Sequence, residues 1–113
     1  LIYPVITMES FGHAGSKENL LGKNPSQKTV QYFCNELNVV KQTPPAFLVH
    51  AKDDELVPIK NSLAYEKSLN KHHVPVTLFT YEKGGHGFGM NNPSSPLKWT
   101  DALTVWLKQM KVL

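Results

Sequence analysis

The run Ala46-Phe-Leu-Val-His50 constrains the fold more than any other part of the 113-residue sequence. It is apolar up to its final histidine and lies between Pro44-Pro45 and the polar stretch Lys52-Asp-Asp-Glu55. A continuous apolar run of this length predicts a strand buried on both faces, which is typical of parallel sheets. Because a parallel neighbour is reached only through a crossover connection, we expect helices between the strands and an α/β fold.

Two further segments have the composition of strands. Leu1–Ile6 is apolar and predicts a first strand, with Pro4 near its end or on a sheet edge because proline cannot donate a ladder hydrogen bond. Val76–Tyr81 is rich in β-branched and aromatic residues and predicts a third strand. A polar, glycine-containing excursion over Thr7–Pro25 follows the first strand.

Three helices are predicted from apolar periodicity. One begins after Ser26, one at Pro58 and one after Ser95-Pro96, all positions that suit a helix start. Their predicted inward faces are Val30, Phe33, Cys34 and Leu37 for the first, Ile59, Ser62, Leu63, Tyr65 and Leu69 for the second, and Trp99, Leu103, Trp106 and Met110 for the third. The order of elements predicts a three-stranded parallel sheet with flanking helices.

Length and composition disfavour several classes of protein. The chain is long enough for one hydrophobic core but not for two. All twelve basic residues are lysines, and without the bidentate fork of arginine a nucleic-acid partner is disfavoured. No apolar run approaches the roughly 18 residues that a membrane helix needs. Cys34 is the only cysteine, and we expect it to be a buried thiol.

The two most chemically suggestive segments follow neighbouring predicted strands. Asp54 follows Ala46–His50, and His86 follows Val76–Tyr81 in the glycine-rich sequence Gly84-Gly-His-Gly-Phe-Gly89. Because ligands gather beyond the carboxyl ends of parallel strands, both side chains are expected at one rim of the sheet. A carboxylate that holds Nδ1–H of an imidazole leaves Nε2 free to accept a proton, as in a nucleophile–histidine–acid triad.

Each of these residues also has an ordinary structural interpretation. Aspartates before a helix are usually an N-cap with a solvated neighbour, and a histidine between glycines is often a turn residue. His50 ends a buried strand, so we expect a core or rim histidine bonded to backbone. A zinc site formed by His13, His50, Asp54 and His86 is disfavoured because no close H-x₃-H or C-x₂-C spacing is present.

Two separated motifs resemble a known family. His50-x-x-x-Asp54-x-x-Val57-Pro58 and Gly85-His86-Gly-Phe88 are similar to the C-terminal motifs of serine α/β-hydrolases of the dienelactone hydrolase-like and prolyl oligopeptidase-like groups. The sequence is more similar still to bacterial esterases and lipases of the acetyl xylan esterase or xylanase-like type. Shared segments are Tyr3–Met8, Ala14–Ser16, Leu20–Gly22, Thr43–Pro45, Phe47–Ala51 and Tyr81–His86.

The resemblance implies roles for individual residues. Asp54 would be the triad acid and His86 the general base, whereas Asp53 lies one position too early. Phe11, His13 and Phe88 would help to shape the substrate pocket. Neither G-x-S-x-G nor an H-G-G-type oxyanion segment occurs, although the chain has seven serines. In the family both elements precede the matched region, so we expect residues 1–113 to be an incomplete domain, the C-terminal segment of an α/β-hydrolase fold without a cofactor.

The leading functional hypothesis is therefore a serine carboxylic-ester hydrolase acting on a small-molecule or polysaccharide ester, with this chain alone inactive. Alternatives are a non-catalytic α/β binding or interaction module and a metal-dependent hydrolase. The resemblance favours a secreted or periplasmic location, which the sequence itself leaves open. We also expect Leu1–Ile6 to pair with a strand from the N-terminal part of the same protein or from a second copy.

Overall fold

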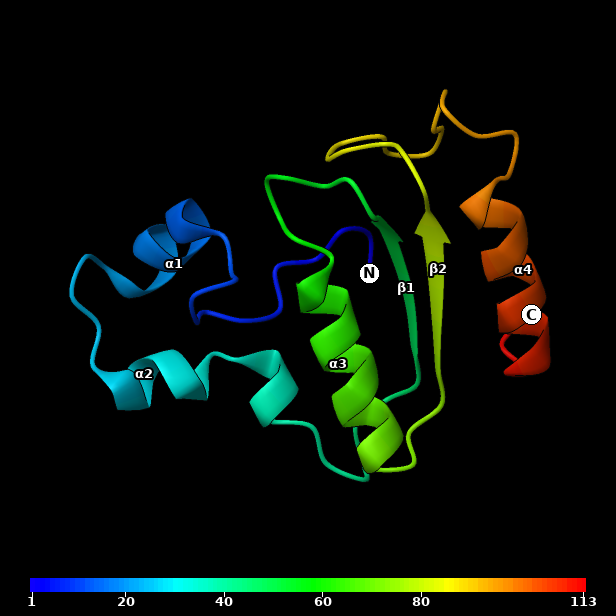
Figure 1. The fold of residues 1–113 in the computed structure, drawn as a ribbon. Coiled ribbons are helices and arrows are strands. Elements are labelled where there is room, and N and C mark those ends of the chain that lie inside the picture. The colour runs from blue at the N-terminus through cyan, green and yellow to red at the C-terminus, as the bar shows by residue number, and fades with distance from the viewer.

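A computed structural model describes all 113 residues. Two strands and four α-helices alternate with long loops (Figure 1). In chain order the elements are α1 (Ala14–Leu21), α2 (Gln27–Tyr32), the 3₁₀ helix η1 (Asn35–Leu37), β1 (Ala46–Ala51), α3 (Lys60–Lys71), β2 (Val76–Tyr81) and α4 (Trp99–Gln109). No helix has the length and apolar character needed to span a lipid bilayer.

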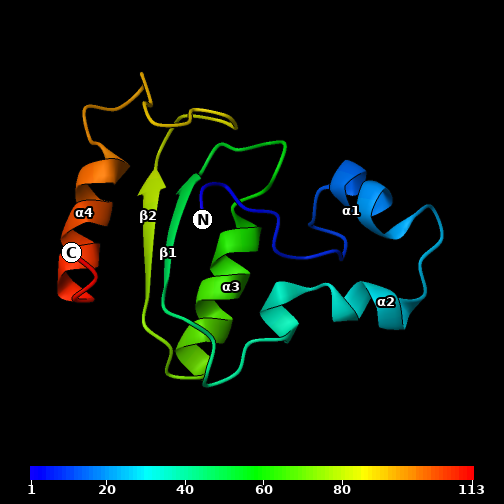
Figure 2. The same ribbon diagram turned by 180° about the vertical axis from the view of Figure 1, so that it is seen from behind.

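The central unit is the βαβ crossover that the sequence predicts. Strands β1 and β2 pair in parallel, in a register that runs from Ala46 opposite Val76 to Ala51 opposite Tyr81. Helix α3 connects them on one side of the sheet, and α4 lies on the other side (Figures 1 and 2). Both strands therefore end at the same rim, and the loops that follow them emerge next to each other.

Burial of β1 on both faces explains its continuous apolar sequence. Phe47, Val49 and Ala51 pack with Tyr81 of β2 and Trp99 of α4 in one core cluster. The alternate side chains, Leu48 and His50, are also completely buried, because they face the side covered by α3. Complete burial of an aliphatic side chain such as Leu48 or Val49 stabilises the fold by about 1.5–3 kcal/mol.

The prediction of a third strand over Leu1–Ile6 is wrong. Only Ile2 pairs with β1, through an isolated parallel bridge to Val49. At the next residue, Tyr3, φ is 36°, which takes the chain away from the strand direction. Pro4 contributes because it has no backbone N–H and cannot donate a ladder hydrogen bond. The sheet is therefore two-stranded, and only the start of Leu1–Ile6 lies alongside it.

A side chain of α3 takes the place of the expected ladder beyond Pro4. The amide oxygen of Asn61 accepts the backbone N–H groups of Ile6 and Thr7 at 3.0 and 3.1 Å. Its nitrogen donates to the carbonyls of Phe11 and Pro58. The backbone N–H and C=O of Ile2 form no hydrogen bond and are therefore open to another strand. Pairing of Leu1–Ile6 with such a strand stays a prediction.

The first predicted helix is interrupted. Ser26 caps α2 as expected, accepting the N–H of Thr29 at 3.1 Å, but α2 ends at Tyr32. The N–H of Asn35 bonds to the carbonyl of Ile6 at 3.0 Å instead of continuing the helix. Val30 and Cys34 are buried as predicted, whereas Phe33 and Leu37 of the same predicted face are exposed.

The other two helices differ less from prediction. Leu63 of α3 is exposed although the periodicity predicts it inward, while Ser62 and Leu69 are buried. Helix α4 begins at Trp99, not directly after Ser95-Pro96. Trp99 is buried, and Leu103 and Trp106 are partly buried and pack against the same core cluster.

Candidate functional site

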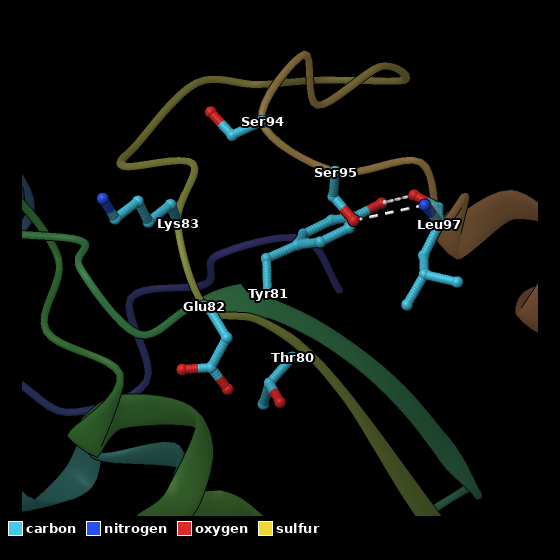
Figure 3. A pocket seen from close by; sticks show the side chains of 7 residues that line it. All are labelled: Thr80, Tyr81, Glu82, Lys83, Ser94, Ser95 and Leu97. Carbon is cyan, nitrogen blue, oxygen red and sulfur yellow. Dashed lines mark hydrogen bonds between the residues drawn. The ribbon is translucent and has the colours of Figure 1, made fainter.

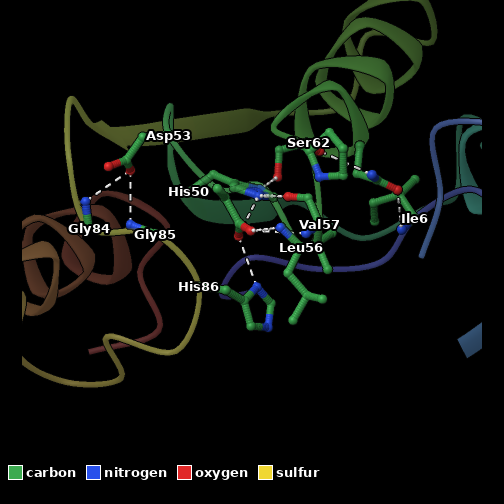
Figure 4. Close-up of polar contacts among 12 residues, drawn as sticks. Ile6, His50, Asp53, Leu56, Val57, Ser62, Gly84, Gly85 and His86 are labelled. Atoms are coloured by element: carbon green, nitrogen blue, oxygen red, sulfur yellow. Dashed lines mark hydrogen bonds and ion pairs between the residues drawn. The ribbon is translucent and has the colours of Figure 1, made fainter. Parts of the chain in front are cut away.

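The loops after β1 and β2 bring an aspartate and a histidine together. Nδ1 of His86 lies 2.8 Å from Oδ2 of Asp54, so the contact that the sequence predicts is present (Figure 4). The Asp54 side chain is fully buried, whereas 28% of the His86 side chain is exposed. The pair thus has an anchored acid and an imidazole that a substrate can reach.

The two carboxylate oxygens of Asp54 have different partners, one in the turn before α3 and one on His86. Its Oδ1 accepts the N–H groups of Leu56 and Val57 at 3.0 and 2.9 Å, which closes the turn leading into α3. The other oxygen faces His86. A carboxylate fixed by two backbone donors cannot rotate away, so the turn sets the direction in which Asp54 meets the imidazole.

A second histidine lies behind the acid. His50 is completely buried, as the sequence predicts, and its Nε2 is 2.8 Å from the carbonyl oxygen of Val57 and 3.3 Å from Oδ2 of Asp54. Because a carbonyl only accepts, Nε2 must carry the hydrogen. Nδ1 of His50 is 2.8 Å from the Ser62 hydroxyl, which can donate to it. His50 therefore supports the acid loop from the core side as a hydrogen-bond donor.

The protons on His86 are set by its hydrogen-bond partner in the same way. A hydrogen bond to the Asp54 carboxylate places the proton on Nδ1 and leaves the Nε2 lone pair available. Nε2 could then accept a proton from a hydroxyl group presented to it, which is the task of a general base. The catalytic roles of Asp54 and His86 remain predictions at this point.

Tyr3 is a member of the site that the residue patterns did not single out. Its ring lies 4.3 Å from the His86 imidazole, centroid to centroid, at an interplanar angle of 54°. The ring also packs edge-on against Phe88 at 5.0 Å. The positive φ of Tyr3 costs about 1–3 kcal/mol in a non-glycine residue. The available signal was that Tyr3 begins a segment, Tyr3–Met8, shared with the esterases that the sequence resembles.

The loop that carries His86 is held at its base. Asp53, expected to be a solvated neighbour, accepts the N–H groups of Gly84 and Gly85 at 2.9 and 2.8 Å (Figure 4). The buried side chain of Asn92 donates to the carbonyl of Lys83 at 2.7 Å. Gly84 is required here because a Cβ would come within 2.6 Å of the Asn92 amide nitrogen.

The predicted substrate-binding residues are distributed differently. Phe88 belongs to the aromatic cluster with Tyr3 and Tyr81 beside His86. His13 caps α1, with Nδ1 accepting the N–H of Ser16 at 3.2 Å. No hydrogen bond or aromatic ring contact joins His13 or Phe11 to Asp54 or His86. Substrate binding by these three residues stays a prediction. No group of three or more His, Cys, Asp or Glu side chains is arranged to hold a metal ion.

The larger of two cavities does not include the pair of Asp54 and His86. It has a volume of about 410 Å³ and is lined by Thr80, Tyr81, Glu82, Lys83, Ser94, Ser95 and Leu97 (Figure 3). The cavity is formed by the end of β2 and the segment leading to α4. Neither Asp54 nor His86 lines it.

Solved structures place this arrangement in the α/β-hydrolase class. The acetyl ester-xyloside bifunctional hydrolase from Caldicellulosiruptor lactoaceticus matches with a TM-score of 0.91 and 39% identity, over 98% of this chain and 41% of its own. A carboxylesterase from Lactobacillus plantarum matches with a TM-score of 0.79 and 25% identity, over 100% of this chain and 44% of its own.

The chain belongs to the prolyl oligopeptidase family, whose model matches residues 3–111. Curated relatives include endo-1,4-beta-xylanase B of Butyrivibrio fibrisolvens, 34% identical over 88% of this chain, and an acetylxylan esterase of Xylanibacter ruminicola, 38% identical over 79%. This chain spans 16% and 20% of the length of those two proteins. The resemblance that the motifs indicate is thereby confirmed.

Proposed function

We propose that this chain supplies the acid and the general base of a serine carboxylic-ester hydrolase. The observation that carries the proposal is the 2.8 Å contact between the buried Asp54 carboxylate and Nδ1 of the partly exposed His86. Membership of a hydrolase family and similarity to esterases support it.

In the proposed reaction, Nε2 of His86 removes the proton from a serine hydroxyl as its oxygen bonds to the acyl carbon. The proton then passes from Nε2 to the alcohol oxygen as the ester C–O bond breaks, and a water molecule releases the acid in a second cycle of the same kind. Asp54 keeps Nδ1 protonated and stabilises the imidazolium that forms.

We propose that the nucleophile is a serine outside residues 1–113. None of the seven serines forms a hydrogen bond with His86. Ser62 is buried against His50, and Ser16 bonds to His13. Donors for the oxyanion would be supplied together with that nucleophile, since an acid and a base alone stabilise little of the developing charge.

Ester hydrolysis fits the site better than cleavage of a glycosidic bond. Glycosidases use two carboxyl groups that flank the scissile bond. Here Asp54 is committed to His86, and Asp53 accepts backbone N–H groups of the histidine loop. We therefore propose an acetyl ester as the bond cleaved, with acetylated xylan as the substrate suggested by the named relatives.

The test is acetate release by the full-length protein that contains these residues. Acetylated xylan and 4-nitrophenyl acetate are the substrates, and xylan without acetyl groups reports glycosidase activity. We expect His86→Ala to lose most esterase activity. His73→Asn is the matched control, because His73 is an exposed histidine with positive φ, which asparagine tolerates, just before the start of β2. Full activity of His86→Ala would contradict the proposal.

A further inference from the structure

We propose that Asp53 is a positioning residue that fixes the backbone beneath His86. The inference rests on the proposed function, and it assigns the first of two consecutive aspartates a role separate from that of the acid. Asp54 directs the imidazole, whereas Asp53 directs the loop from which the imidazole projects.

The contact pattern supports this division of roles. Oδ1 of Asp53 accepts hydrogen bonds from both Gly84 and Gly85, the two residues directly before His86, at 2.9 and 2.8 Å (Figure 4). Hydrogen bonds to a charged acceptor are roughly twice as strong as neutral ones. No hydrogen bond joins Asp53 to the imidazole itself, so its influence on His86 must pass through the loop.

Asp53 belongs to a run in which successive residues each contact the end of β2 or the segment after it. The N–H of Lys52 bonds to the carbonyl of Tyr81 at 2.8 Å, and its ammonium group pairs with Glu82. Asp53 then holds Gly84 and Gly85, and Asp54 holds His86. The two loops are thus joined step by step up to the catalytic pair.

The glycine content of the loop explains why such a tether is needed. Gly85, Gly87 and Gly89 have φ values of +57°, +91° and +57°, conformations that side chains rarely adopt. Glycine loses more conformational freedom on ordering than any other residue, so a loop of this composition is poorly held by its own backbone. With Asp53 on one side and Asn92 on the other, the segment before His86 has two anchors.

The experiment compares Asp53→Ala, Asp53→Asn and the control Glu55→Gln in the full-length protein. Glu55 is an exposed carboxylate of the same loop and forms no hydrogen bond. We expect Asp53→Ala to lower kcat on 4-nitrophenyl acetate by up to about 100-fold, the loss that a displacement of about 1 Å can cause, with little change in KM. Asp53→Asn keeps an acceptor oxygen and should retain more activity, and Glu55→Gln should match the wild type.

A second readout measures the tether directly. Hydrogen exchange of the Gly84 and Gly85 amides should be faster in Asp53→Ala than in wild type or Glu55→Gln, at temperatures well below the unfolding midpoint. Unchanged kcat and unchanged exchange in Asp53→Ala, with activity lost in His86→Ala, would overturn the positioning role and leave the proposed function standing. If the kcat of Asp53→Ala returns to the wild-type value on cooling further below the unfolding midpoint, Asp53 has a merely structural role, and the positioning role is also overturned. An active His86→Ala would overturn both.

Discussion

Asp54→Asn perturbs the site with almost no change in side-chain shape. In the wild type, Oδ1 of Asp54 accepts the backbone N–H groups of Leu56 and Val57. The amide oxygen of the new asparagine should take this place, because only an acceptor can satisfy both donors. The NH₂ group is then placed where Oδ2 stood, facing Nδ1 of His86 at 2.8 Å and Nε2 of His50 at 3.3 Å. A hydrogen-bond donor thus replaces an acceptor at the point where the imidazole is oriented.

The size of the expected loss in kcat follows from the tautomer of His86. To accept from the new NH₂ group, Nδ1 must give up its hydrogen, and the proton moves to Nε2, which can then no longer act as a base. A substitution of this kind in a serine triad costs about 10⁴-fold in kcat, or about 5.4 kcal/mol of transition-state stabilisation. The free energy of unfolding should fall by about 1–3 kcal/mol, because one N–H of the new amide is buried against the Nε2–H of His50 without an acceptor. His50 keeps its hydrogen bond to the carbonyl of Val57.

The assay is steady-state hydrolysis of 4-nitrophenyl acetate by the full-length protein, with stability measured by denaturant unfolding. Glu55→Gln, at an exposed carboxylate that forms no hydrogen bond, is the control and should be unchanged in both measurements. Retention of more than about a tenth of wild-type kcat by Asp54→Asn would refute the assignment of the acid, since such a loss is under about 1.4 kcal/mol.

Three further variants test the surroundings of the pair. Ser62→Ala should lower the free energy of unfolding by about 1–3 kcal/mol in denaturant titrations, because it leaves Nδ1 of the buried His50 without a donor. Tyr3→Ala should lower kcat through loss of the ring packed on His86, whereas Tyr3→Phe, which keeps the ring, should not. Gly84→Ala should lower the unfolding midpoint in calorimetry, because the new Cβ displaces the Asn92 amide from the loop.

The parts of the fold that the sequence predicts are those set by burial. Strand β1 is apolar except for His50 because both of its faces are covered, and β2 pairs with it in parallel across the α3 crossover. Parallel pairing puts the ends of both strands at one rim, which is why the contact between Asp54 and His86 could be predicted from two separate loops. Local pattern and topology were sufficient for these features.

Other features depend on long-range hydrogen bonds that leave no periodic signal. An apolar run such as Leu1–Ile6 reads as a strand, but the Asn61 amide, which is 55 residues from Ile6, takes the N–H groups that a ladder would have used. The helix after Ser26 stops where Asn35 bonds to Ile6.

The proposed role of Asp53 could not be predicted from the sequence, because it depends on long-range hydrogen bonds. Adjacency to Asp54 does not indicate that its carboxylate reaches the backbone at Gly84 and Gly85.

The most direct test of the proposed acid and base is reaction of the full-length protein with a serine-directed fluorophosphonate, followed by mass-spectrometric mapping of the labelled residue. The reagent reports nucleophile activation by a histidine, independently of the natural substrate. We expect one labelled serine, outside residues 1–113, and near-complete loss of labelling in His86→Ala. Labelling of a serine within these residues, or labelling that persists at the wild-type rate in His86→Ala, would contradict it.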